Sequence, residues 1–249
     1  IKRNDGMSKF MSYVGKFDDG RDVENLLMNY LQNKHLKKEK ISLHKRVDGI
    51  EMGVGRYFNG TDWVGPVEIN FEHIKFMPGD IGPATSEMGT GAWYDDNEKN
   101  KLFQETLEKI KPYLVDINFK GDFALNCMVN ETGAYVLEAT SRFGSPIVHL
   151  QSEIQDLKWF DFLLAIAKGE KYNLKWKKGY GIVLGMMVPP FPYSKNLKES
   201  LFCGVNIYFK DFSDSDLKHI HFEEISKRVC LENKKELAID CGLYYISDN

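Results

Sequence analysis

The sequence predicts an α/β (α+β) protein in which helices flank an antiparallel sheet and a small β-rich domain follows. Two pairs of apolar, β-branched segments are each joined by a short turn that contains glycine. Asparagine and glycine tolerate the positive φ angles of tight turns, so each pair is expected to be an antiparallel hairpin. The expected hairpins are Ile50–Phe58 with Trp63–Phe71 across Asn59-Gly60, and Phe123–Val129 with Ala134–Thr140 across Asn130–Gly133.

Helical periodicity appears in three other segments. In Asp22–Gln32, apolar residues recur at three- and four-residue spacing, which predicts an amphipathic helix. A second helix is expected to start at Asp95, where Glu98 would complete a capping box. A third helix is expected over Asp156–Lys168, ended by Gly169.

Two further segments and the domain limits complete the expected organisation. Residues 41–47 are expected to be a strand and residues 78–94 a glycine-rich loop. We expect residues 1–47 to be part of a small subdomain, 48–177 a large subdomain, and 178–249 an incomplete, β-rich C-terminal domain. The chain starts without methionine inside a strand pattern and stops in another, so we expect a piece of a longer protein.

The composition is that of a soluble globular protein, with 43% hydrophobic and 28% charged residues. A formal charge of −3 gives no general attraction to nucleic acid or anionic membrane. The longest uncharged apolar run, Gly179–Tyr193, contains three prolines and is too short to span a bilayer. Four dispersed cysteines without a Cys-x-x-Cys pair are typical of reduced thiols. We therefore expect a cytoplasmic protein, monomeric or weakly oligomeric, with neither nucleic acid nor membrane as partner.

The stretch Tyr135–Pro146 carries the most informative chemistry. An apolar strand delivers a carboxylate at Glu138, and Thr140, two residues on, is expected on the same face. Arg142 follows after two more residues. An acid, a neutral oxygen and a guanidinium suit a magnesium ion that holds phosphates, with a cation on the far side. The alternative is a strand end with a surface ion pair, because short motifs are frequent by chance.

Other sequence signals for nucleotide or metal chemistry are weak. The sequence has no Walker A motif, and Gly89-Thr90-Gly91 lacks the third glycine of a dinucleotide fingerprint. It has no nucleophile elbow and no Cys/His pair at a recognisable spacing. His219 and His221 could chelate a metal from one face of a strand, but no third ligand stands at a useful spacing.

Three co-linear stretches resemble the ATP-grasp ligases, and within them the phosphoribosylamine–glycine ligases of purine biosynthesis. Glu72–Lys75, followed by Gly79–Pro83 and Glu87–Gly89, is similar to the family's Asp-His-Lys-Arg and Gly-Asp-x-Gly-Pro-Asn-Thr-Gly-Gly-Met-Gly motifs. Asp48–Glu51 is similar to its Gly-Glu-Glu motif.

The third stretch contains the carboxylate described above. Gly121–Met128, Glu138 and Arg142–Gly144 are similar to the family's Gly-x-Leu-Tyr, Leu-Glu-Phe-Asn and Arg-Phe-Gly-Asp-Pro-Glu motifs. The resemblance runs in order from Lys2 to about Gly169. It implies an ATP-grasp fold without the family's N-terminal domain.

The resemblance implies ATP as cosubstrate and Mg²⁺ or Mn²⁺ as cofactor. It also implies a two-step reaction, in which a carboxylate is phosphorylated by ATP and an amine then displaces phosphate to form an amide. The implied nucleotide-binding residues are Lys2 at a phosphate, Lys45 and Val47 at the adenine hinge, Glu51 at the ribose, and Met128. The implied metal ligands are Glu138, Thr140 and Asn126, the implied catalytic residue is Arg142, and the implied substrate surface is His73, Lys75, Asp80, Met88 and Gly89.

This chain departs from the family pattern at three informative positions. Thr140 stands where the family has an asparagine, and Ser145 and Ile147 stand where it has two acids. These acids lie where the ammonium group of an amino acid could be held. Two alternatives therefore remain: an ATP-grasp amide ligase with a different acid and amine, and a nucleotide-binding module without ligase activity.

Overall fold

The structure is a computed structural model of the chain, and it describes residues 1–3, 13–33, 40–193, 204–223, 225–229, 235–239 and 244–248. The chain divides into two compact units, Ile1–Asp48 and Gly49–Asn249. The first unit contains strand β1 (Lys2–Arg3), helix α1 (Arg21–Gln32) and strand β2 (Ile41–Ser42), and β1 pairs with β2 antiparallel.

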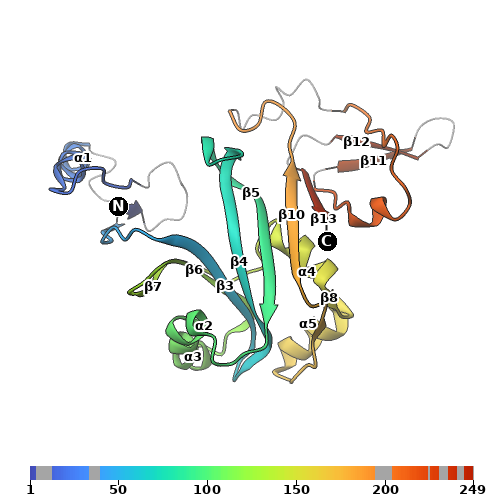
Figure 1. Cartoon of the computed structure of the whole chain (residues 1–249), viewed down its shortest axis with the longest axis horizontal. Helices are drawn as coiled ribbons and strands as arrows, with labels where there is room; N and C mark the ends of the chain where they lie inside the picture. Colours follow the sequence, from blue (N-terminus) through green and yellow to red (C-terminus); the bar gives the residue numbers. More distant parts are fainter. Residues whose placement is uncertain are drawn as a thin grey trace. The chain divides into compact units, whose positions relative to one another are not determined.

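The second unit is built on a seven-stranded sheet in which every pairing between neighbours is antiparallel. The strand order is β13-β10-β5-β4-β3-β6-β7, and the strands are drawn through the centre of Figure 1. Both expected hairpins are present, which confirms the predicted antiparallel sheet. The strands are β3 (Ile50–Asn59), β4 (Trp63–Met77), β5 (Ile81–Asp95), β6 (Lys120–Asn130), β7 (Gly133–Thr140), β10 (Tyr180–Met186) and β13 (Tyr244–Asp248).

Asparagine side chains stabilise both hairpin turns. Asn59 Oδ1 accepts hydrogen bonds from the backbone N–H groups of Thr61 and Asp62, at 3.1 and 2.8 Å. Asn130 Oδ1 accepts one from the N–H of Thr132 at 2.9 Å. Such local side-chain bonds satisfy backbone donors that the strands leave unpaired, which explains why these sequences form turns.

Helices cover the two faces of the sheet. Helices α2 (Lys101–Glu105) and α3 (Leu107–Asp116) pack on one face, and α4 (Ile147–Ile154) and α5 (Trp159–Lys168) lie against the other, as Figure 1 shows. The core beneath α2 and α3 contains twelve buried residues: Val54, Phe58, Trp63, Val67, Ile69, Leu102, Phe103, Leu107, Leu114, Phe123, Leu125 and Cys127. Smaller apolar clusters lie beneath α4 and α5.

Three expected element limits were wrong. The glycine-rich stretch 78–94 is mostly strand β5, because its small residues allow close packing between neighbouring strands. The helix expected from Asp95 begins at Lys101, where the Asn100 side chain accepts a hydrogen bond from the N–H of Phe103. The strand expected over 41–47 is only the two-residue β2.

Helix α4 is the one α-helix, among the described residues of the sheet-bearing unit, that was not expected from the sequence. Its buried residues Ile147, Leu150, Gln151 and Ile154 follow the i, i+3, i+4, i+7 spacing of an amphipathic helix. Pro146 stands at its N-cap, a position compatible with proline. The periodic signal is therefore present in the sequence, although no helix was predicted for this segment.

The C-terminal part of the chain contributes two strands to the main sheet. β10 pairs with β5, and β13 pairs with β10. Two short antiparallel pairs lie outside that sheet: β8 (Gln155–Asp156) with β9 (Lys175–Trp176), and β11 (Ile225–Val229) with β12 (Lys235–Ile239). A domain boundary near Lys178 remains a proposal. β10 and β13 come after that position in the chain but belong to the large sheet. No helix in the described part of the chain is both long and apolar enough to cross a membrane.

Replacing Phe103 with alanine tests the core beneath α2 and α3. Phe103 is 1% exposed, and its ring centroid lies 5.9 Å from that of Trp63. We expect Phe103→Ala to lower the free energy of unfolding by about 3–5 kcal/mol through lost burial and a cavity. Phe160→Ala, at a residue that is 76% exposed, is the matched control and should change it by less than about 1 kcal/mol. Urea titration measures both, and equal effects would contradict this core assignment.

Candidate functional site

One face of the large sheet carries a series of polar side chains, and we call it the polar face. Successive side chains of a strand point to opposite faces, so Glu68, Asn70 and Glu72 of β4 share one face, opposite Ile69 in the apolar core. Directly paired residues on neighbouring strands also share a face. The polar face, defined by these pairings and contacts, consists of Glu68, Asn70, Glu72, Thr90, Asp122, Asn126, Glu138 and Thr140.

The register of four strands brings Glu138 into a row of polar residues. Glu138 of β7 pairs with Asn126 of β6, Asn126 pairs with Gly53 of β3, and Gly53 pairs with Asn70 of β4. The two predicted metal ligands Glu138 and Asn126 are therefore direct neighbours. Thr140, the third, lies two residues along β7 and pairs with Ala124. Their role as metal ligands remains a prediction.

Gly53 leaves room above β3 for side chains from both neighbouring strands. A Cβ atom at this position would lie 2.0 Å from Asn70 Oδ1, so any side chain here would displace Asn70. Across the same gap, Asn126 Nδ2 donates hydrogen bonds to Glu72 Oε1 and Oε2 at 3.3 and 3.2 Å. The missing side chain of Gly53 thus allows polar groups of β6 and β4 to meet.

The other predicted nucleotide-binding residues lie on both units. Glu51 of β3 pairs with Met128 of β6, two residues along the strands from the pair formed by Gly53 and Asn126. Lys45 and Val47 lie in the first unit, in a segment without regular secondary structure. The side chain of Lys2 lies outside the described part of the chain.

Arg142 lies just beyond the end of β7 and is exposed. Its Nη1 donates a hydrogen bond to the carbonyl oxygen of Phe143 at 2.7 Å. A guanidinium carries five N–H donors, so this contact leaves it further donors for an anion. A catalytic role for Arg142 remains a prediction.

The predicted substrate residues lie together on the β4–β5 hairpin. His73 pairs with Gly89, Lys75 pairs with Ala84, and Asp80 occupies the turn with a φ of 59°. Met88 precedes Gly89 on β5. Gly89 also has a packing role, since a Cβ there would lie 2.6 Å from the carbonyl oxygen of Val183 on β10. Substrate binding by these residues remains a prediction.

His219 and His221 do not lie on a strand as expected, because Asp216–His219 is a short 3₁₀ helix and His221 follows it without regular structure. Both rings hydrogen-bond to Glu153 of α4, at 3.1 and 2.9 Å. His149 lies 2.7 Å from Glu223 Oε1, and its ring stacks on that of His221 with centroids 4.9 Å apart. Among the described residues, no three His, Cys, Asp or Glu side chains are arranged to hold a metal ion. The cluster therefore attaches residues 219–223 to α4.

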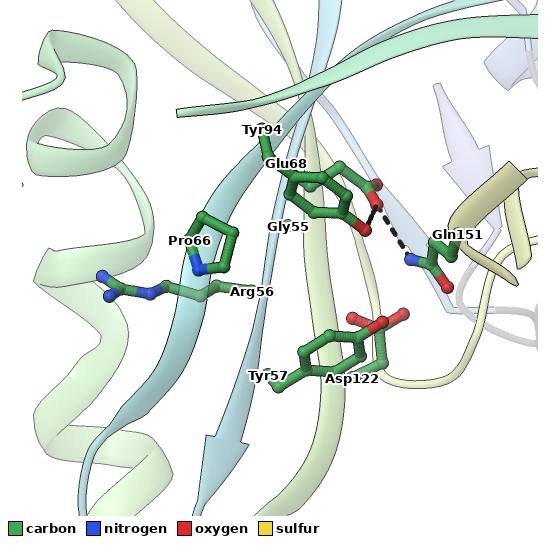
Figure 2. Close-up of a pocket in the computed structure, with 8 residues that line it drawn as sticks. All are labelled: Gly55, Arg56, Tyr57, Pro66, Glu68, Tyr94, Asp122 and Gln151. Atoms are coloured by element: carbon green, nitrogen blue, oxygen red, sulfur yellow. Dashed lines mark hydrogen bonds between the residues drawn. The ribbon is translucent and has the colours of Figure 1, made fainter. Parts of the chain in front are cut away.

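A buried acidic network beneath α4 was not anticipated from the sequence. Glu68 accepts hydrogen bonds from Tyr94 Oη, Gln151 Nε2 and Asn70 Nδ2 at 3.0, 2.9 and 3.3 Å. Figure 2 shows Glu68, Tyr94 and Gln151 converging above Asp122. All four line a small pocket, together with Gly55, Arg56, Tyr57 and Pro66.

Both carboxyl groups of this network have raised pKa values. Burial, and secondly the charge of Glu68, raise the pKa of Asp122 to about 8. Burial also raises the pKa of Glu68, which its three hydrogen-bond donors partly offset. Arg56 points away from both, as Figure 2 shows, and pairs with Glu98 at 2.6 Å. At neutral pH Asp122 is therefore protonated.

The pH dependence of stability tests this assignment. The pKa of Asp122 is about 8 in the folded protein and about 3.9 in an unfolded chain, so folding takes up a proton between these values. The free energy of unfolding should fall as pH rises from about 4 to about 8, by at most about 1.4 kcal/mol per pH unit from this group. Asp122→Asn should remove that contribution, as measured by urea unfolding from pH 5 to pH 9.

The exposed Asp116→Asn variant, at the end of α3, is the matched control for the Asp122→Asn measurement. It should follow the wild-type pH profile. An Asp122→Asn profile parallel to that of the wild type would show that Asp122 is ionised in the folded protein at neutral pH.

Comparison with known proteins gives one sequence relative and two solved structures with informative similarity. No family model matches the chain. Phosphoribosylamine–glycine ligase of Methanosarcina barkeri is 22% identical over 216 residues, which are 82% of this chain and 48% of the relative. The crystal structure of phosphoribosylamine–glycine ligase from Thermotoga maritima matches with a TM-score of 0.56 at 18% identity, over 82% of this chain and 49% of that chain.

Phosphoribosylglycinamide synthetase of Anaerococcus prevotii matches with a TM-score of 0.51 at 15% identity, over 97% of this chain and 57% of that chain. The chain thus spans about half the length of the relatives that it matches. These similarities confirm the fold that the sequence motifs had indicated: the chain has the ATP-grasp fold and is similar to phosphoribosylamine–glycine ligases over most of its length.

Proposed function

We propose that the chain is the nucleotide-binding part of an ATP-dependent carboxylate–amine ligase that acts through an acyl phosphate, most like phosphoribosylamine–glycine ligase of purine biosynthesis. The observation that carries this proposal is the pairing of Glu138 with Asn126 on the polar face of an ATP-grasp sheet. Glu51 and Met128 form a pair on β3 and β6, two residues along from Gly53 and Asn126. Thr140 and Arg142 follow Glu138 in the opposite direction along the sheet.

The donor set beside Glu138 suits Mg²⁺. A carboxylate, an amide and a hydroxyl all offer oxygen atoms, which hard cations prefer, and Mg²⁺ in nucleotide sites is commonly held by one or two carboxylates plus phosphates. Glu138 would hold the ion, and Asn126 and Thr140 would supply neutral oxygens. When bound, magnesium would bridge the ATP phosphates and offset their charge.

Each residue of the proposed nucleotide site has a distinct task. Lys2 would contact a phosphate as a point charge. The backbone of Lys45 and Val47 would bind the adenine edge, and Glu51 would accept hydrogen bonds from the ribose hydroxyls. Arg142 would stabilise the charge of the transferring phosphoryl group.

The proposed reaction needs positioning and charge rather than a covalent nucleophile. A carboxylate oxygen of the substrate attacks the γ-phosphorus of ATP, the bond to the bridging oxygen breaks, and ADP leaves. The amine nitrogen then attacks the acyl carbon, phosphate leaves with the bonding electrons, and the nitrogen releases its proton to solvent. His73, Lys75, Asp80, Met88 and Gly89 would bind a phosphorylated amine. These small-molecule reactions would take place in the cytoplasm, with a monomer or weak oligomer as the working form.

A second candidate, an ATP-grasp amide ligase with another acid and amine, is favoured by the packing of Ile147. This residue is 7% exposed and packs with Leu150, Ile154 and Val183 in the core beneath α4. It therefore offers no charge to a substrate ammonium group. Ser145, two positions earlier, offers only a hydroxyl.

Calorimetry with ADP and Mg²⁺ tests the nucleotide site directly. We expect binding that needs magnesium, and at least about tenfold weaker binding in Glu138→Gln because a metal ligand is lost. Glu131→Gln, in the exposed turn between β6 and β7, is the matched control and should bind like the wild type. Magnesium-dependent binding that Glu138→Gln leaves unchanged would displace Glu138 from the metal site.

Phosphate release from ATP, measured with pairs of acids and amines, separates the candidate activities. Release that requires glycine and phosphoribosylamine supports the first candidate, and release with another pair supports the second. Nucleotide binding without turnover for any pair would favour a module without ligase activity, which the replacement of asparagine by Thr140 had suggested.

A further inference from the structure

The polar face contains a second carboxylate near Glu138 that has no assigned role in ion binding. Glu72 lies on β4, two strands away from Asn126 in the sheet order, with β3 between them. Its two carboxylate oxygens accept hydrogen bonds from Asn126 Nδ2. This contact joins residues 54 positions apart in the sequence, so it depends on the fold rather than on local chain geometry.

Asn126 is placed between the two carboxylates. It is the direct cross-strand partner of Glu138 and the hydrogen-bond donor to Glu72. Gly53 makes this arrangement possible, because its position between Asn126 and Asn70 carries no side chain. The Asn126 amide thus bonds to an acidic group of β4, and its residue is the cross-strand neighbour of an acidic residue of β7 on the same face of the sheet.

Two buried oxygen atoms beside Glu72 independently indicate a ligand. Asn70, two residues before Glu72 on the same face, is 4% exposed, and Thr90, directly across from Glu72, is 2% exposed. Within the described residues, Asn70 Oδ1 and Thr90 Oγ1 have no hydrogen-bond partner. A buried polar atom left unsatisfied costs about 1–3 kcal/mol, so such atoms are normally paired with a ligand or with ordered water.

The chemistry of this group matches a hard cation. Glu72 and Glu138 offer carboxylate oxygens, and Asn70 offers an amide oxygen. Divalent cations in nucleotide sites are typically bound through one or two carboxylates, with phosphates and water in the remaining positions. A second carboxylate is especially useful here, since the hydroxyl of Thr140 is a weak neutral ligand.

We propose that Glu72 is the second carboxylate of the divalent-cation site, opposite Glu138, and that Asn126 holds its side chain in position. The proposal rests on the proposed nucleotide site and extends it to β4. Asn70, whose Oδ1 lies above Gly53, then lines the same subsite and binds either the ion or its water ligands. Thr90 lies on β5, four strands from Glu138 in the sheet order, and its hydroxyl would bind ordered water beside Glu72.

Electron paramagnetic resonance of Mn²⁺, titrated in the presence of ADP, tests this assignment without relying on turnover. Glu72→Gln keeps the size of the side chain and removes its charge. We expect it to weaken Mn²⁺ affinity by at least about tenfold, as Glu138→Gln should. Glu131→Gln is again the control and should match the wild type.

The outcomes separate this inference from the proposed function. Mn²⁺–ADP binding by the wild type with unchanged affinity in Glu72→Gln would overturn the role of Glu72, leave the proposed function intact, and assign Asn70 and Thr90 to ordered water. Absence of Mn²⁺-dependent binding in the wild type would overturn both. If circular dichroism shows Glu72→Gln to be unfolded, Glu72→Asp decides: weaker Mn²⁺ affinity supports the assignment, and wild-type affinity overturns it.

Discussion

The pairing of β3 with β4 on one side and β6 on the other is the constraint on which the candidate site depends. This register places Gly53 between Asn126 and Asn70, and side chains from both neighbouring strands occupy the space above it. A shift by one residue would exchange the two faces, moving Glu72 and Asn126 into the apolar core. The apolar residues beneath α2 and α3 oppose such a shift, so the core on one face fixes the position of the polar groups on the other.

The polar face has two regions with different physical roles. Near α4, Glu68 and Asp122 are buried and have raised pKa values, and neutral donors such as Gln151 hold Glu68, so both residues contribute to packing. Farther along the strands, Glu72, Asn126 and Glu138 are only partly covered or exposed. Buried carboxyl groups without a cation stay protonated or need donors, whereas accessible carboxylates are available to bind cations. Burial therefore separates the structural acids from the candidate ligands.

Local signals in the sequence predicted the hairpins but not every element. Asn59 and Asn130 form the turns through their own side chains, so short-range chemistry is sufficient there. Strand β5 was missed because its glycines are typical of loops, although here they permit close approach to β10. The contact between Asn126 and Glu72 could not be predicted, since it depends on the order of three strands. The sequence spacing around Glu138 identified one part of the site, and tertiary pairing supplied its neighbours.

This chain follows the family motifs more closely at the proposed nucleotide site, the nucleotide end, than at the proposed site for the acid substrate, the acid-binding end. At the nucleotide end, the proposed cation site keeps a carboxylate at Glu138 and adds a second at Glu72, so the replacement by Thr140 is compatible with the proposed cation binding. At the acid-binding end, Ile147 is part of the core beneath α4, where a charged side chain would be costly to bury. Helix α4 therefore uses Ile147, at the position where the family has an acid, for packing in the core. This packing favours the second candidate activity at the acid-binding end only, and it leaves the proposed nucleotide chemistry unchanged.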